Sequence, residues 1–548
     1  MTDLNDKSYH AGGRINRRTF LKVAGVGGVA LGAGLPMRWA DAATPADTIV
    51  VGHISAPQTM DLDAGGTFHP ASTDALANLY DALVDYSYKV VSGGVRVPDF
   101  DAPMRPRLAE SWEVSKDGRR YVFRLKRGTV SQYGNELTSA DVVYSIEHAF
   151  ALKGLNFFSF NVGGIKGPDN VKALDRYTFE VRLPEWNPIF LKTRAQWSAG
   201  IYDSAEVKKH VTAKDPWAQK WLTKHSAGFG AYRIESWLSG REMVLVARDD
   251  YHLGAPKVKR VVLREIPSSA NRMALLQTGD IDMARRLTFK QLDSLRRDPK
   301  IKVLNNLSGN QYTWMLLRAD IAPYNDRRVR QAIALAIPYK DLVKRVFYGE
   351  AVVMKAMVPH SYPEASGEFW KYETDLDKAK ALLKSAGVKG LTLRLMYALG
   401  QPEVENTAIF IQANLRKIGI RVTLEKVTPS VQQGKKFKKE YVAALENFDT
   451  PWLPDIGYAA RIFSVSYAVV NFVNFKNKDY DRIYEDAMRE EDPASRRNLL
   501  RKLQAIFMRE LPYIPICITG DPWAMRKNIE GYTWHLENVL QYRDFRKA

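Results

Sequence analysis

The alternation of predicted strands and helices along almost the whole chain is the feature that most constrains its fold. Apolar or alternating segments at 48–54, 121–125 and 242–247 predict strands, and segments at 72–86 and 139–151 predict helices. This alternation, without a repeat of fixed period, is typical of an α/β protein, and 548 residues are enough for two or three domains. The pattern continues with strands predicted at 176–183, 391–397 and 421–427 and helices at 328–349, 377–385, 403–418, 480–490 and 494–509.

The N-terminal segment contains the three parts of an export signal. A basic region precedes an apolar run at 23–35, and the small residues Ala40 and Ala42 then form a small-x-small cleavage site. The apolar run is too short to span a bilayer, so it is not a membrane anchor. The basic region resembles the twin-arginine export signal in Arg17, Arg18, Phe20, Leu21 and Lys22.

This resemblance implies export of the folded protein by the twin-arginine translocase. We expect residues 1–42 to be the signal peptide, cleavage after Ala42, and a mature protein in the periplasm. A basic tail followed by a buried helix is the alternative, but it does not account for the cleavage site or for the change in composition that follows it.

The composition argues against an enzyme. The single cysteine, Cys517, cannot hold an iron–sulfur cluster, and its apolar neighbours predict burial. The nine histidines form no His-Glu-x-x-His motif, and the chain has no Gly-x-Ser-x-Gly motif. An exported enzyme is therefore a disfavoured alternative, and we predict no catalytic residue, no metal ligand and no cofactor.

The positive charge of the chain does not indicate a nucleic-acid partner. The formal net charge is +19, but the basic residues are spread along the chain and mixed with acidic ones. The densest basic cluster, Lys435–Lys439, is expected to be a solvated loop or helix face. No zinc-ligand spacing or RNA-binding signature accompanies it.

Four groups of segments resemble the family-5 extracellular solute-binding proteins, the peptide- and nickel-receptor family. They are 79–84 with 106–143, then 228–234 with 276–282, then 326–333, and then 379–387 with 415–420. Many of these residues have a structural explanation, since Asp117-Gly118 suits a hairpin turn and Gly387 suits the end of a helix. Leu276 and Ile281 are expected in the core. The motifs therefore indicate a scaffold and say little about the ligand.

The resemblance implies a periplasmic binding protein-like fold, a two-lobed clamp with an extra subdomain (class II, cluster C type) that closes on its ligand about a hinge. The lobes are expected to be discontinuous in sequence. Lobe I is predicted at 43–79, 220–306 and 512–548, the extra subdomain (lobe II) at 80–219, and lobe III at 307–511. The implied partners are the permease and ATPase complex of an ABC-type importer, and the receptor itself is expected to be a monomer.

The resemblance also implies where the ligand lies. In the family it is enclosed between lobes, against the segment after the first strand and a late Trp-x-x-Asp motif. These correspond to Thr67, Phe68 and His69 on one wall and to Trp452 and Asp455 on the other. In peptide-binding members the aspartate pairs with the ligand's ammonium, so Asp455 is expected to be solvated in an empty cleft and ion-paired when ligand is bound. The alternatives are a core tryptophan and an aspartate that only caps a turn.

Other positions leave the ligand class open. Arg318 follows an apolar strand where relatives usually have asparagine, so it is a candidate partner for an anionic group. Pro451 stands where peptide binders tend to have glycine, and it has no N–H to donate to a peptide backbone. Function is therefore predicted as capture of a peptide or peptide-like solute for an ABC-type importer. The alternatives are an opine or amino-acid conjugate, a nickel complex or haem. Weaker candidates for ligand contact are Tyr133, Trp197 and Arg194.

Overall fold

The computed structural model describes residues 44–548 except 65–69, 92–93, 450–452 and 469. Ala43–Ala548 form one compact unit, which is the part of the chain after the predicted leader. No helix of the described part is both long and apolar enough to cross a membrane. The predicted residues that lie outside the described part are Arg17, Arg18, Phe20, Leu21, Lys22, Ala40 and Ala42 of the leader, and Thr67, Phe68, His69 and Trp452.

A seven-stranded mixed sheet has the first strand of the unit at its centre. Strand β1 (Thr48–His53) is buried along its whole length and runs parallel to β12 (Arg260–Glu265) and β13 (Met283–Arg285) on its two sides. The other strands, in the sheet order β10-β11-β12-β1-β13-β21-β14, are β10 (Tyr232–Leu238), β11 (Glu242–Ala247), β21 (Trp523–Arg526) and β14 (Ile301–Leu304). Helices follow β1, β12 and β13, namely α2 (Pro70–Leu79), α8 (Ser269–Thr278) and α9 (Phe289–Leu295).

A four-stranded antiparallel sheet with its own hydrophobic core forms a subdomain within residues 80–219. The predicted turn is present, since Gly118 has a φ of +62° between the first two strands. Helix α3 (Ser139–Leu152) begins with a capping box in which Thr138 and Asp141 satisfy each other's backbone N–H groups. The strands are β6 (Ala109–Val114), β7 (Arg120–Leu125), β9 (Thr178–Arg182) and β8 (Val171–Ala173), and two further helices are α4 (Leu155–Val162) and α5 (Phe190–Thr193).

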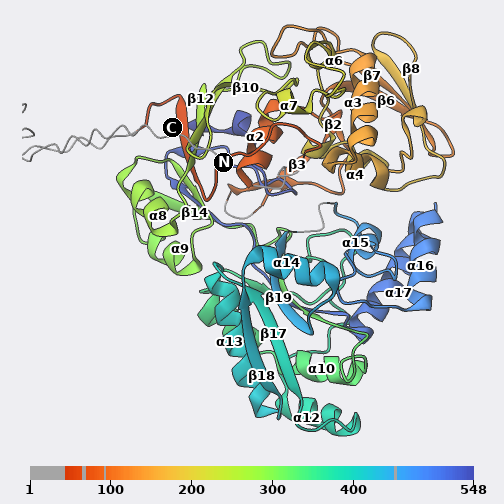
Figure 1. The fold of residues 1–548 in the computed structure, drawn as a ribbon, viewed down its shortest axis with the longest axis vertical. Helices are drawn as coiled ribbons and strands as arrows, with labels where there is room; N and C mark the ends of the chain where they lie inside the picture. Colours follow the sequence, from red (N-terminus) through yellow and green to blue (C-terminus); the bar gives the residue numbers. More distant parts are fainter. Residues whose placement is uncertain (1–43, 65–69, 92–93, 450–452, 469) are drawn as a thin grey trace, which may run out of the picture. The chain divides into compact units, whose positions relative to one another are not determined.

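A six-stranded mixed sheet organises most of the second half of the chain. Its order is β16-β20-β15-β19-β17-β18, and helix α13 (Pro402–Lys417) packs on β17 and β18 (Figure 1). The strands are β16 (Val352–Val353), β20 (Tyr513–Ile518), β15 (Gln311–Leu317), β19 (Ala443–Asp449), β17 (Thr392–Ala398) and β18 (Arg421–Val427). The other helices are α10 (Arg327–Leu335), α11 (Tyr339–Asp341), α12 (Leu376–Ser385), α14 (Pro429–Lys438), α15 (Ile456–Phe463), α16 (Lys478–Arg489) and α17 (Pro493–Glu510).

The chain crosses between the two large sheets in two neighbouring segments. One crossing leads from β14 to β15, and the other, residues 519–522, leads from β20 to β21. Asn305 in the first donates to the carbonyl of Thr519 in the second at 3.1 Å, and the Thr519 N–H donates to Gln311 O at 2.9 Å. Paired crossing segments of this kind are where a hinge between two lobes can bend. Because β20 pairs with β15, the second crossing lies some residues beyond the predicted limit at 512.

The α/β fold class is confirmed, and most predicted elements are present with ends shifted by a few residues. Two helices differ more. The helix predicted at 72–86 ends at Leu79, and the one predicted at 328–349 is interrupted after Leu335. Pro338 explains the second break, because proline removes a backbone donor and disfavours helical geometry in the residue before it. The expected core position Cys517 is buried in β20.

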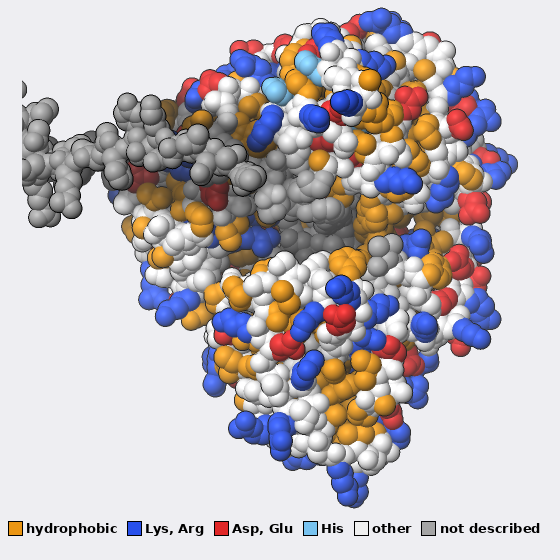
Figure 2. All heavy atoms as spheres, viewed as in Figure 1, with side chains coloured by type: hydrophobic (Ala, Val, Ile, Leu, Met, Phe, Trp, Pro, Cys, Tyr) orange, Lys and Arg blue, Asp and Glu red, His pale blue; other side chains and the backbone are white. Residues whose placement is uncertain are grey.

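The basic cluster Lys435–Lys439 is only partly the solvated face that was expected. It forms the last turn of α14 and the residue after it, and Lys436 is fully buried in an ion pair with Glu446 of β19. One of the four lysines is therefore part of the core. On the face shown in Figure 2, basic and acidic side chains are interspersed.

Candidate functional site

The N-terminal end of helix α15 contacts the four-stranded subdomain. Leu453 and Tyr458 pack against Ile189, which directly precedes helix α5, in a small apolar cluster. Phe158 of α4 and Ile462 of α15 extend this cluster. The described residues of the Trp-x-x-Asp motif therefore lie where the subdomain touches the part of the chain built on the six-stranded sheet.

Asp455 is the N-cap of helix α15 and is only 3 % exposed. Its Oδ1 accepts a hydrogen bond from Tyr458 N at 2.9 Å, and Arg496 of α17 donates to Oδ1 at 3.1 Å and to Oδ2 at 2.9 Å. Burial alone would raise the pKa of Asp455, but Arg496, Lys192 of α5 and the Tyr458 N–H hold it below its ordinary value. The carboxylate is therefore ionised, capped and paired, and not solvated as expected for an empty cleft.

Arg318 is placed at the far end of strand β15 with its guanidinium fully engaged. Its Nε and Nη2 donate to the two carboxylate oxygens of Asp320 at 2.8 and 2.7 Å, and Nη1 donates to the carbonyl of Lys439. Arg318 lines neither of the cavities described below. Its contact with an anionic ligand stays a prediction, for which this arrangement offers no free donor group facing a cavity.

An aromatic group lies across the same junction. Tyr86 belongs to the core of the four-stranded subdomain, and its ring centroid is 5.7 Å from that of Phe100, which is 6.4 Å from that of Tyr362. Tyr86 and Tyr362 are buried, and so is Tyr458 of α15. The carboxylate of Glu537, in the C-terminal segment, raises the pKa of Tyr86 and of Tyr458 after the larger effect of burial. Glu537 therefore lies within electrostatic range of both sides of the junction.

Two cavities flank the crossing segments. One, of about 320 Å³, is walled by Phe100, Tyr362 and Trp534, with Asn306 of the first crossing also in its lining. The other, of about 430 Å³, includes Thr519, Asp521 and the start of helix α13 in its lining. Glu403 of α13 accepts a hydrogen bond from Phe289 N of α9 at 2.9 Å, so this second cavity also spans both large sheets.

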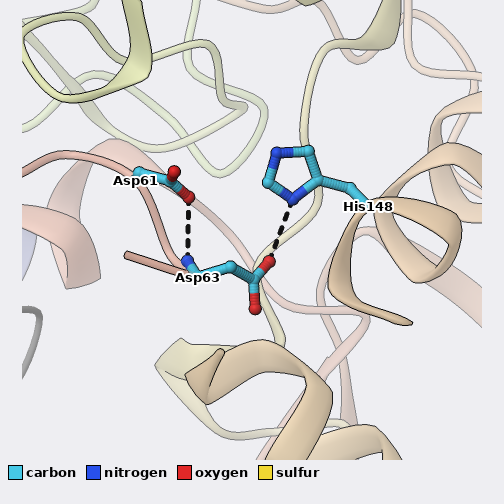
Figure 3. A group of neighbouring side chains, drawn as sticks. All are labelled: Asp61, Asp63 and His148. Atoms are coloured by element: carbon cyan, nitrogen blue, oxygen red, sulfur yellow. Dashed lines mark hydrogen bonds and ion pairs between the residues drawn. The ribbon is translucent and has the colours of Figure 1, made fainter. Parts of the chain in front are cut away.

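Asp61, Asp63 and His148 form a fully enclosed polar cluster, with ligand-type atoms all within 4.8 Å of one another (Figure 3). Carboxylates and an imidazole are a set that can bind a divalent cation. However, Asp63 Oδ2 is 3.0 Å from His148 Nδ1, and Oδ1 accepts from Asn156 N at 3.0 Å and from Phe157 N at 3.3 Å. Since both oxygens of Asp63 are hydrogen-bonded, we interpret the cluster as a joint between the segment after β1 and helices α3 and α4.

Comparison with known proteins assigns this fold to a family. Residues 103–468 match the family described as bacterial extracellular solute-binding proteins, family 5. The match covers more than half of the chain, so the chain belongs to this family. The sequence motifs predicted this family and its two-lobed α/β architecture, and both predictions are confirmed.

Individual relatives bind different solutes. The chain is 27 % identical over 525 residues to the probable D,D-dipeptide-binding periplasmic protein DdpA of Escherichia coli K12, with 93 % of this chain and 96 % of DdpA covered. The periplasmic binding protein DppA of Helicobacter pylori, solved with the peptide STSA, is 24 % identical with a TM-score of 0.75 over 91 % of this chain and 98 % of that one. NikZ of Campylobacter jejuni, solved with Ni(L-His), is 20 % identical with a TM-score of 0.74 over 92 % and 100 %.

The sequence did not point to the residues that complete the junction. Tyr86, Tyr362 and Glu537 belong to no motif of the family resemblance and lie in turns or irregular segments. Trp197, another candidate for ligand contact, is 6 % exposed, and its backbone N–H donates to the Glu537 carboxylate.

Proposed function

We propose that the chain is the periplasmic receptor of an ABC-type importer and that it captures a peptide or peptide-like solute. Membership of the solute-binding family carries this proposal, and the paired crossings between two large sheets supply the hinge on which capture depends. Closure around the solute would present the closed form to a membrane permease and its ATPase. The receptor acts as a monomer and performs no chemistry on its cargo.

Native mass spectrometry of protein purified from the periplasm tests the proposal directly. Release of a bound organic solute on mild denaturation supports it, and that solute should then raise the melting temperature, because it binds only the folded state. Small-angle scattering should show a smaller radius of gyration with the solute than without it. A solute that binds but leaves the radius unchanged would contradict a closing clamp.

A metal complex is the second candidate cargo. NikZ, a structural neighbour of the same fold, was solved with Ni(L-His), and haem or an opine would require the same kind of enclosed site. Metal analysis of the periplasmic protein, without added metal, distinguishes these cargoes. Stoichiometric nickel or iron would replace the peptide proposal, whereas an organic solute without metal would retain it.

We propose export by the twin-arginine translocase with cleavage after Ala42. The support is the Arg17-Arg18 pair with Phe20, Leu21 and Lys22. Changing Arg17 and Arg18 to lysine should leave full-length precursor in the cytoplasm. Normal periplasmic maturation of this double variant would overturn the assignment, and N-terminal sequencing of the mature wild type checks the cleavage position.

At the binding site, we propose that Asp455 and Trp452 border the solute, with Thr67, Phe68 and His69 on the facing wall. A ligand ammonium at Asp455 has to share the carboxylate with Arg496, which already contacts both oxygens. Asp455→Ala should weaken binding by about 2–5 kcal/mol, or roughly thirtyfold or more. If Arg318 faces an anionic solute instead, calorimetry would show a large loss of binding affinity in Arg318→Ala and little change of affinity in Asp455→Ala.

A further inference from the structure

The cavity of about 430 Å³ lies where strands of both large sheets end, beside the crossing that must bend. Pro267 and Leu287 in its lining follow β12 and β13, the parallel neighbours of β1, and Leu399 and Pro429 follow the parallel strands β17 and β18. Gly520 of the crossing also belongs to the lining. Ligands of α/β proteins bind at the carboxyl ends of parallel strands, and a group in this cavity would contact both sheets and the segment that joins them.

The cavity adjoins the segments that lead to both walls of the proposed solute site. Ile54 in its lining directly follows β1, and the chain continues from there to Thr67. Asn447 of β19 is also in the lining, and the chain continues from there to Trp452. Asn447 Oδ1 is buried without a hydrogen-bond partner, so it is available to accept an N–H of a solute. The cavity therefore shares its supporting strands with the proposed solute site.

Arg272 of helix α8 places a buried cation in the wall of this cavity, where it is 1 % exposed. Among the described residues no carboxylate forms an ion pair with it, and burial together with the charge of Arg286 lowers its pKa to about 10. Its guanidinium donates only to backbone carbonyls, which are those of Ile266, Pro267, Arg285 and Arg286. A buried charge without a counter-ion is costly, so an anion in the cavity would stabilise it.

The two acidic residues of the lining are engaged by other groups. Asp521 of the crossing accepts a hydrogen bond from Arg285 at 2.8 Å, and Glu403 of α13 accepts one from Phe289 N at 2.9 Å. Neither carboxylate contacts Arg272. The charge of that arginine is therefore left to a group from outside the described chain.

Arg286 adds a second guanidinium to the lining, and this residue is exposed. Its backbone φ is +55°, in the left-handed region that residues other than glycine rarely adopt. Backbone strain of this kind is concentrated at ligand sites, where the surrounding structure holds it. Arg286 therefore lies at the cavity in a position that costs free energy, and a ligand contact accounts for that cost.

Three helices also begin at the cavity. They are α8, α13 and α14, whose first residues Ser269, Pro402 and Pro429 are all in the lining. The N-terminal end of a helix carries a partial positive charge and unpaired N–H groups, so the three ends add to the positive potential of the two arginines. Gln401, the N-cap of α13, makes no side-chain capping hydrogen bond with these N–H groups.

We propose that this cavity binds a carboxylate or another anionic group of the solute, which Arg286 contacts and the buried charge of Arg272 stabilises. This inference rests on the proposed function and narrows it to solutes that carry an acidic group, such as peptides with a free C-terminus. An ammonium group of the same solute remains assigned to Asp455. Because the cavity is lined by both large sheets, the anion would be bound most tightly when the clamp is closed.

The test uses probe pairs that differ only in the acidic group, with the mature protein purified by unfolding and refolding to remove bound solute. The pairs are D-Ala-D-Ala and L-Ala-L-Ala-L-Ala, each with its C-terminal amide, and binding is measured by calorimetry. The variants are Arg286→Asn, since asparagine tolerates left-handed backbone, and Arg286→Lys, which keeps the charge. The control is Arg297→Asn, because Arg297 lies just after α9, is exposed and pairs with Asp293 at 3.0 Å.

The expected result is that the wild type binds an acid probe about tenfold or more tightly than its amide. Arg286→Asn should remove this preference, whereas Arg286→Lys should retain part of it and Arg297→Asn all of it. An unchanged preference in Arg286→Asn would overturn the role of the cavity and leave the solute-binding function standing.

Equal binding of the acid and amide forms by the wild type would overturn the anionic class. If none of the four probes binds, the solute released in native mass spectrometry decides the class. A released solute without an acidic group would overturn this inference but not the receptor function, whereas an acidic solute that Arg286→Asn no longer retains would support it.

Discussion

Two carboxylates at different joints of the chain, the buried Asp81 and the half-buried Glu537, differ in the partners that surround them. Asp81 joins the seven-stranded sheet to the four-stranded subdomain, and Arg107, His252 and Tyr251 all contact it, the last two at 2.7 and 2.8 Å. The charge of Glu537, in the C-terminal segment, acts on Tyr86 and on Tyr458 of helix α15, and within the described part of the chain no cation is ion-paired with it.

This difference in partners separates a joint that only holds two parts of the protein together from a joint that is available to bind a ligand. Burial works against ionisation at both sites, but at Asp81 the surrounding Arg107, His252 and Arg543 depress the pKa far below its usual range. At Glu537 the pKa is raised. A saturated charge cluster fixes two parts of a protein together, whereas an unsaturated one leaves free energy available for a ligand.

The largest expected effect comes from breaking the saturated cluster. Asp81→Ala should lower the free energy of unfolding by about 3–5 kcal/mol, because it leaves the Arg107 guanidinium buried without its partner. Urea unfolding of the ligand-free protein measures this. The control is Asp249→Ala, which removes an exposed pair with Lys259 and should cost about 1 kcal/mol or less. Equal losses in the two variants would show that the cluster around Asp81 is not a stabilising joint.

The second effect concerns the crossing that must bend between the two large sheets. Gly520 has a φ of +64°, and a Cβ there would lie 2.1 Å from Asn305 Oδ1 and 2.8 Å from the carbonyl of Asn306. Gly520→Ala should therefore cost about 1–2 kcal/mol for the left-handed backbone and roughly 1–3 kcal/mol more for crowding.

Gly240→Ala is the matched control for the crossing. Gly240 has a similar φ of +70° in the β10–β11 turn, and nothing lies within 4 Å of an added Cβ. Only the backbone cost should therefore appear in its urea unfolding. If the two alanine variants lose the same stability, the two crossing segments are not packed against each other as described.

Much of the fold could be predicted because its signals are local. The turn at Gly118, the start of α3 at Ser139 and the burial of Ile281 follow from short segments of sequence, and the motif order identified the family. The break at Pro338 was missed because the apolar pattern on both sides of it suggests one continuous helix. Single prolines change geometry without changing that pattern.

The site was less predictable because its contacts join residues far apart in sequence. The Trp-x-x-Asp motif located Asp455, but nothing in the motif predicts that Arg496, 41 residues later, occupies its carboxylate. Glu537 lies in an irregular loop where no periodic pattern distinguishes a core position from a surface one. Only the fold brings its charge within electrostatic range of Tyr86 and Tyr458, and such long-range proximity is not encoded in any local pattern.

The smallest effect, and the one that tests the comparison most directly, is the pH dependence of Glu537→Gln. In the ligand-free protein Glu537 faces Asp85, Arg107, Tyr86 and Tyr458, and its folded pKa of about 8 lies above its ordinary value. Above the ordinary pKa the unfolded state binds fewer protons than the folded state at this group, so wild-type stability falls as pH rises toward 8.

Glutamine cannot ionise, so the variant lacks this loss. Its melting temperature should match that of the wild type near pH 5 and exceed it at pH 8.5. The corresponding gain in stability is on the order of 1 kcal/mol, since the side chain is partly exposed and water screens its charge. If the variant and the wild type have parallel pH profiles, Glu537 is compensated in the empty protein and does not differ from Asp81 in the way described.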